Sequence, residues 1–164
     1  MHTENLILER LRELSEIAPA GYAVALHIRY STPTFLFQTY PKQWVDYYSN
    51  KGLVMQDPTV AWAFSNTGTR RWSDLADQDA AGVFGHAAEH GLGYGTTIAV
   101  EDATGRSMAS AARSDREYAD DEIAVIEGKI AELHTLASEL TALSDGTTAA
   151  LKNLAVDFSH SAGR

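Results

Sequence analysis

A set of two tryptophans, three tyrosines and one aspartate within residues 40–72 holds the side chains best suited to chemistry. A wall of aromatic rings holds an apolar body, and its phenol and indole donors fix a few polar atoms. A carboxylate beside such a wall loses water and must accept hydrogen bonds in return. The set therefore indicates a pocket for a small amphiphile, with an amide N–H for the acid and carbonyls for the donors. Its members are Tyr40, Trp44, Tyr47, Tyr48, Asp57 and Trp72.

The spacing of the set has two interpretations. Pro41 suits the first turn of a helix, and Trp44 and Tyr48 then lie on one face because they are four residues apart. However, Asp57 followed by Pro58 is also typical of an ordinary helix start, with the aspartate as N-cap. Aromatic side chains at helical spacing often belong to a core. The residue types alone leave both interpretations open.

The order of these residues resembles a known family. The run Tyr40-Pro41-x-x-Trp44-x-x-x-Tyr48, then Asp57-Pro58-Thr59 and Trp72, is similar to the acyl-homoserine-lactone-binding domain of LuxR-type quorum-sensing regulators. A second block, Gly91-Leu92-x-Tyr94-Gly95-x-Thr97 with Met108-Ala109-Ser110, resembles the same family. The similarity extends over about residues 22–143.

The resemblance implies a non-enzymatic sensor, without a cofactor, that encloses an N-acyl-homoserine lactone. It implies that Trp44 donates its indole N–H to the lactone carbonyl and that Asp57 accepts from the ligand amide N–H. Tyr40 and Ser110 would donate to the acyl carbonyl. The rest of the lining that the family implies is Tyr48, Thr59, Trp72, Leu92 and Thr97.

The acyl chain is expected to be long because the expected strands carry small residues. A buried methylene is worth about 0.8 kcal/mol, so a roomy pocket predicts acyl groups of about eight carbons or more. The alternative is that the alanines let a helix sit close on the sheet, which leaves a short pocket. The residues concerned are Ala23, Ala25, Ala109, Ala111 and Ala112, with Phe35, Leu36 and Phe37 nearby.

Two residues depart from the family pattern. Val45 stands where some relatives that favour oxidised acyl chains carry an arginine. A 3-oxo group is therefore expected to add little to the affinity. Ala99 stands where a proline is common, which alters only a strand.

The elements that must position the site alternate between helices and short strands. Helices are expected at residues 3–18, 41–50, 58–65, 74–90 and 119–143, and strands at 22–30, 35–40, 95–101 and 106–113. In the first strand, Tyr22, Val24 and Leu26 are expected to face one way, and Ala23, Ala25 and His27 the other. This order predicts an α+β fold, an α/β/α sandwich whose central antiparallel sheet has helices on both faces.

Residues 1–145 are expected to form the autoinducer-binding domain, and residues 146–164 a short C-terminal helix or a frayed tail. Only two basic residues follow Ser144, so no helix-turn-helix DNA-binding domain is expected. The last long helix carries a 3-4 apolar repeat, which either packs on its own sheet or forms a dimer seam. The expected partners are a second copy or a full-length regulator that the chain inhibits. The repeat consists of Ile123, Ile126, Ile130, Leu133, Ala137 and Leu140.

The composition excludes several classes of function. There are 22 acidic against 13 basic residues, and the net charge of −9 repels phosphate backbones, so direct nucleic acid binding is not expected. The chain has no cysteine, which excludes disulfides and thiolate metal sites. Residues 1–18 read as a charged amphipathic helix, and no apolar run has membrane-spanning length. We therefore expect a cytoplasmic protein that does not enter a membrane.

Other patterns point less clearly to a site. His86 and His90 stand four residues apart, but no third metal ligand is evident, so no metal is expected. The glycines at 91, 93 and 95 lie between a helix and a strand, which is the reverse of a phosphate loop. They are expected to cap the helix and to allow close packing.

A hydrolase acting on an acyl amide or lactone is the enzyme alternative. It would need Ser107 or Ser110, a histidine such as His27 or His90, and an acid such as Asp57 to meet in space. No spacing in the sequence requires that meeting.

Overall fold

The structure is a computed structural model, and it describes residues 2–141 of the chain. The 146–164 segment, expected to be a short helix or a tail, lies outside the described residues. The helices are α1 (His2–Ile17), α2 (Lys42–Asn50), η1 (Leu53–Met55), α3 (Pro58–Ser65), η2 (Trp72–Gln78), α4 (Val83–Glu89) and α5 (Asp120–Thr141). The strands are β1 (Gly21–Arg29), β2 (Thr32–Gln38), β3 (Gly68–Arg71), β4 (Tyr94–Asp102) and β5 (Gly105–Arg113).

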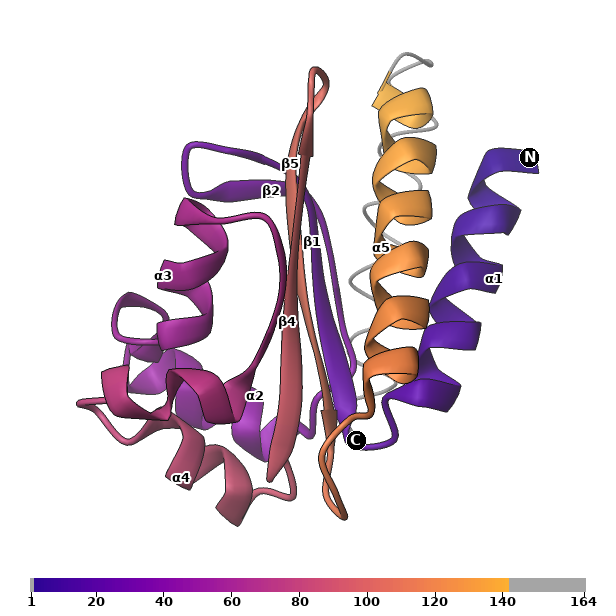
Figure 1. Cartoon of the computed structure of the whole chain (residues 1–164). Coiled ribbons are helices and arrows are strands. Elements are labelled where there is room, and N and C mark those ends of the chain that lie inside the picture. Colours follow the sequence, from indigo (N-terminus) through magenta and orange to yellow (C-terminus); the bar gives the residue numbers. More distant parts are fainter. Residues whose placement is uncertain (1, 142–164) are drawn as a thin grey trace.

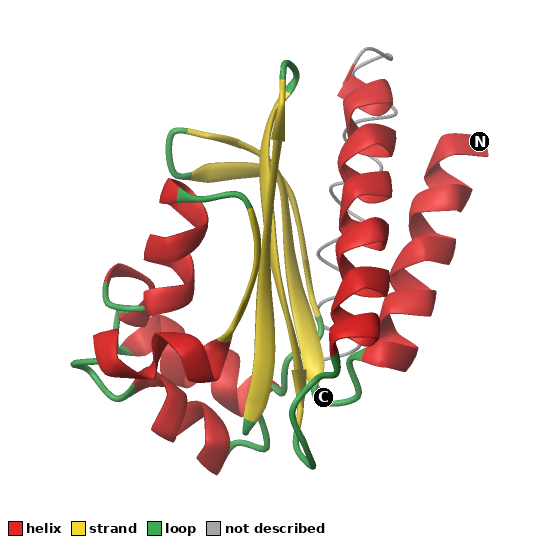
Figure 2. Cartoon of the chain, viewed as in Figure 1, coloured by secondary structure: helices red, strands yellow, loops and turns green. Residues whose placement is uncertain are grey.

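The five strands form one antiparallel sheet in the order β2-β1-β5-β4-β3. Helices α1 and α5 cover one face of the sheet, and α2, α3 and α4 lie on the other (Figures 1 and 2). The predicted α/β/α sandwich is therefore confirmed. No helix within residues 2–141 combines the length and the apolar content needed to cross a membrane.

The main apolar core lies between the sheet and α5. All six residues of the apolar repeat in α5 are buried there, beside Tyr22 and Val24 of β1 and Leu11 of α1. The helix α1 then packs along α5. The repeat thus serves the internal core, and a dimer seam would have to use other residues.

The prediction of one continuous helix at residues 74–90 is wrong. The chain forms η2 and α4 instead, and Gly82 separates them with a left-handed φ of 70°. The Asp79 carboxylate accepts from the backbone N–H groups of Val83 and Phe84 at 2.8 and 2.9 Å, which starts the new helix. The edge strand β3 was not predicted, because four residues carry too little alternation to reveal it.

His27 also departs from the predicted alternation of β1. Its φ is 52°, which is unusual for a residue other than glycine, and its ring stacks on His134 of α5 at a centroid distance of 4.2 Å. Its Nε2 lies 2.8 Å from the His134 carbonyl oxygen. The side chain therefore lies on the α5 side of the sheet, not on the side of Ala23.

We predict that Ile130→Glu unfolds the chain, because Ile130 has no exposed surface and an isolated buried charge costs about 4 kcal/mol or more of unfolding free energy. The matched control is Val125→Glu on the same helix, where the side chain is 49% exposed and little change is expected. Circular dichroism during thermal melting measures both. A folded, monomeric Ile130→Glu protein would show that the repeat lies between copies after all.

Candidate functional site

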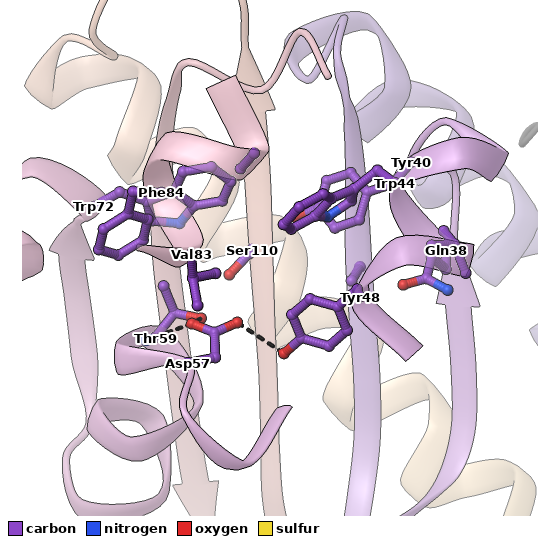
Figure 3. A pocket seen from close by; sticks show the side chains of 13 residues that line it. Gln38, Tyr40, Trp44, Tyr48, Asp57, Thr59, Trp72, Val83, Phe84 and Ser110 are labelled. Carbon is purple, nitrogen blue, oxygen red and sulfur yellow. Dashed lines mark hydrogen bonds between the residues drawn. The ribbon is translucent and has the colours of Figure 1, made fainter. Parts of the chain in front are cut away.

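A cavity of about 110 Å³ opens between the sheet and the layer formed by α2, α3 and α4 (Figure 3). It collects most of the residues that the sequence singled out. The predicted residues in its lining are Tyr40, Trp44, Tyr48, Asp57, Thr59, Trp72 and Ser110. Leu92 and Thr97 are not among its lining residues.

Asp57 is both a helix cap and a cavity residue. Its Oδ1 accepts from the backbone N–H and the hydroxyl of Thr59, at 2.9 and 2.8 Å, which caps α3. Its Oδ2 accepts from the Tyr48 hydroxyl at 2.8 Å. A carboxylate has about four positions that can accept a hydrogen bond, and these bonds fill three. Oδ2 therefore keeps one position for a further donor, while the residue is only 9% exposed.

The buried phenol of Tyr40 and the partly buried phenol of Tyr48 supply hydrogen-bond donors to the cavity. Burial raises the pKa of Tyr48, and so do the negative charge of Asp57 and the hydrogen bond to it. Burial and the Asp57 charge also raise the pKa of Tyr40, against a hydrogen bond with Ser110. Both phenols are therefore neutral hydrogen-bond donors at physiological pH.

The backbone leaves room for the aromatic rings at two glycines. A Cβ on Gly21, whose φ is 120°, would lie 2.8 Å from Cδ1 of Tyr40. A Cβ on Gly95 would overlap the indole of Trp72. The close packing expected at the 91–95 glycines is thus confirmed at Gly95.

Thr97 lies behind the cavity wall and orders two of its members. The Trp72 indole N–H donates to the Thr97 hydroxyl at 3.2 Å, and the Thr97 and Ser110 hydroxyls lie 2.7 Å apart. Thr97 is 2% exposed, so its own hydrogen is best satisfied when it donates to Ser110. That arrangement leaves the Ser110 hydrogen available to Tyr40 or to a ligand.

Leu92 is a packing residue. It is fully buried in the same apolar cluster as Tyr40, Trp44 and Trp72. It follows the end of α4, where Gly91 has a φ of 88° and the Leu92 N–H bonds the Ala87 carbonyl at 2.9 Å. The predicted helix cap at Gly91 is therefore confirmed.

Sequence reasoning missed part of the lining. Gln38 stands two residues before Tyr40, at the end of β2, and strand alternation from Tyr40 was a usable signal for it. The α4 residues had no clear signal, because the predicted helix ran past the break at Gly82. The remaining lining residues are Ala23, Gln38, Val45, Val83, Phe84 and Ala87.

His86 of α4 and His90, which directly follows that helix, pack against α2. The Trp44 and His90 ring centroids lie 5.4 Å apart, and those of Tyr47 and His86 lie 5.2 Å apart. Within residues 2–141, no group of three or more His, Asp or Glu side chains lies close enough to hold a metal ion.

A serine, a histidine and an aspartate do meet, but elsewhere. The Ser107 Oγ lies 2.6 Å from Nδ1 of His134, whose Nε2 lies 3.0 Å from Oδ1 of Asp102. The hydrogen bonds from His134 and Thr104 lower the pKa of Asp102. Ser107 has no exposed surface and lies on the α5 side, so a substrate has no access to it. The group ties α5 to the β4–β5 hairpin.

The meeting of Asp57 with a serine and a histidine, which a hydrolase would need, does not occur in the cavity. Ser110 and Asp57 both line it, but no histidine is among its lining residues. The hydroxyl of Ser110 therefore has no base beside it there, and the geometry favours binding over hydrolysis.

The comparisons with known proteins identify a family for most of the chain. The family described as "Autoinducer binding domain" matches residues 7–142. None of the curated protein sequences matches the chain.

Among solved structures, the chain resembles Escherichia coli SdiA, with a TM-score of 0.62, 24% identity, and coverage of 85% of this chain and 62% of that one. For SdiA in complex with octanoyl-rac-glycerol, the TM-score is 0.62 and the identity is 22%. The match covers 82% of this chain and 58% of that one. A third structure is that of CepR2 from Burkholderia cenocepacia, an N-acylhomoserine-lactone-dependent LuxR family transcription factor. Its TM-score is 0.54 and its identity is 18%, and the match covers 84% of this chain and 94% of that one.

The match to SdiA spans about three fifths of the SdiA chains. At these identities the structural likeness shows the fold, and the family match shows the class of function. The chain belongs to the autoinducer binding domain family of LuxR-type quorum-sensing regulators, whose domains are non-enzymatic sensors of small molecules.

Proposed function

We propose that the cavity binds an N-acyl-homoserine lactone through its amide. One observation carries this proposal: a nearly buried carboxylate has three accepting positions filled, and its fourth is left for a donor at an aromatic cavity. A buried acceptor without a partner is costly, so the cavity favours a ligand with an N–H group inside an apolar body.

The other donors fit the two carbonyls of such a ligand. The indole N–H of Trp44 serves the lactone carbonyl, and the hydroxyls of Tyr40 and Ser110 serve the acyl carbonyl. The indole N–H of Trp72 is already donated to Thr97, so Trp72 offers its ring face rather than a donor. Phe84 stacks on that ring at a centroid distance of 5.7 Å, which extends the apolar wall.

The same proposal covers the regulator around the cavity. We assign residues 1–145 to the autoinducer-binding domain of a cytoplasmic transcription regulator that acts as a dimer. A heterodimer with a full-length LuxR-type protein, which the chain would inhibit, is the alternative. Size-exclusion chromatography of the chain alone and mixed with such a regulator distinguishes a homodimer from a heterodimer.

A second candidate ligand is an acylglycerol, because a structure of SdiA holds octanoyl-rac-glycerol. A glycerol hydroxyl also donates hydrogen bonds, so the Asp57 carboxylate can accept one from either class of ligand. The lactone fits better, since its amide N–H and two carbonyls match one acceptor and three donors in the lining.

The roomy pocket expected from the alanines is not supported. Ala109 pairs with Val24 across β5 and β1, and Ala111 pairs with Tyr22, so both alanines lie in the α5-side core. Phe35 and Phe37 lie in that core too, and Leu36 is 45% exposed. Of the five alanines only Ala23 lines the cavity. The alternative interpretation, close packing of a helix and a short pocket, fits the structure.

We predict that Asp57→Asn weakens lactone binding by well over tenfold, because a hydrogen bond to a charged group is worth about 2 to 3 kcal/mol. Asparagine also caps helices, so the fold should persist. Calorimetry measures the affinity, and the melting temperature without ligand is the control. Unchanged affinity would mean that Asp57 is only a helix cap.

We predict that short acyl groups bind best, because about 110 Å³ lies below the range of about 300 to 1,000 Å³ typical of drug-sized ligands. A ligand enclosed by the folded state raises the melting temperature with the logarithm of its concentration. Thermal shifts with butanoyl, hexanoyl, octanoyl and dodecanoyl lactones, and with octanoyl glycerol, measure this. An optimum at eight carbons or more would reverse the conclusion about length.

We predict that Gly95→Ala lowers lactone affinity by about tenfold or more, because the added methyl displaces the Trp72 indole from its bond to Thr97. Gly85→Ala, where an added Cβ meets no atom within 4 Å, is the control. Tryptophan fluorescence should change only in the first variant. Equal affinities for both variants would show that the position of Trp72 is unimportant.

A further inference from the structure

Gln38 is the polar lining residue to which the proposed lactone contacts give no role. It ends β2 and lies across the cavity from Trp72 and Phe84 (Figure 3). Tyr48 and Thr59 hold Asp57, while Tyr40, Trp44 and Ser110 are assigned to carbonyls.

The strand register places Gln38 relative to the other floor residues. Gln38 of β2 is opposite Ala23 of β1, and Ala23 is opposite Ser110 of β5. Neighbouring strands are about 4.8 Å apart, so Gln38 and Ser110 stand two strand spacings, about 10 Å, from each other. All three residues line the cavity, and only a methyl group lies between the two polar side chains.

This row gives the acyl chain a direction. If the acyl carbonyl lies at Ser110, the rest of the acyl chain can extend in the direction opposite to Trp72. It then passes over the methyl group of Ala23 and arrives at the amide of Gln38. An unsubstituted chain would end against the Gln38 amide without forming a hydrogen bond to it.

We infer that Gln38 is a specificity-determining residue, which hydrogen-bonds a polar substituent, an oxo or a hydroxyl group, on a short acyl chain. The amide has two N–H donors and an acceptor oxygen with two lone pairs, so it can serve either substituent beside a contact within the protein. The inference rests on the proposed function and replaces the expectation that an oxo group adds little. Val45 supplies no donor, but Gln38 does.

The test is calorimetry with hexanoyl, 3-oxohexanoyl and 3-hydroxyhexanoyl lactones on three proteins. The wild type should bind at least one substituted lactone about tenfold more tightly than the hexanoyl lactone, as expected for a hydrogen bond within an apolar site. Gln38→Met keeps the length of the side chain without its hydrogen bonds, and it should bring that ratio close to one. Leu36→Met, on the same strand but outside the cavity lining, should keep the wild-type ratio.

The outcomes separate this inference from the proposed function. If hexanoyl lactone binds but the wild type does not discriminate, or if Gln38→Met keeps the preference, the inference is wrong and the lactone proposal stands. If none of the three lactones binds the wild type, the proposed function fails and the inference fails with it. Binding of hexanoyl lactone by Gln38→Met also shows that the variant is folded.

Discussion

The site depends on the hydrogen bonds that the Asp57 carboxylate accepts. A charged group that is only 9% exposed needs several hydrogen bonds, and here Thr59 and Tyr48 supply them from two different elements. The same three bonds start α3 and tie it to α2. The helix cap and the proposed binding group are therefore one feature, and these bonds fix the orientation of the remaining accepting position of the carboxylate.

The sheet separates two kinds of interior. On the α1 and α5 side, apolar side chains and the His27–His134 stack fill the space, and Ser107 has no exposed surface. On the other side, the aromatic residues leave a cavity because Gly95 lets the Trp72 ring sit against the strand. The main apolar core and the proposed ligand site thus lie on opposite faces of the same strands.

The sequence predicted the features that arise locally. Helical spacing placed Trp44 and Tyr48 together, and N-cap chemistry placed Asp57 at the start of α3, as the structure has them. What it could not predict depends on pairing between distant strands. The face of Ala109 follows from its partner Val24, and the reversed side chain of His27 follows from the stack with α5. Gly82 was not recognised as a break, because a single glycine within a helical pattern is often tolerated.

The central claim is that Asp57 accepts a hydrogen bond from the amide of the ligand. Nuclear magnetic resonance of hexanoyl-homoserine lactone labelled with ¹⁵N at that amide tests it at the atom concerned. The account predicts that the bound amide proton moves strongly downfield, as expected for a charge-assisted hydrogen bond, and exchanges slowly with water. A bound ligand whose amide proton keeps its shift in water and exchanges freely would contradict the claim.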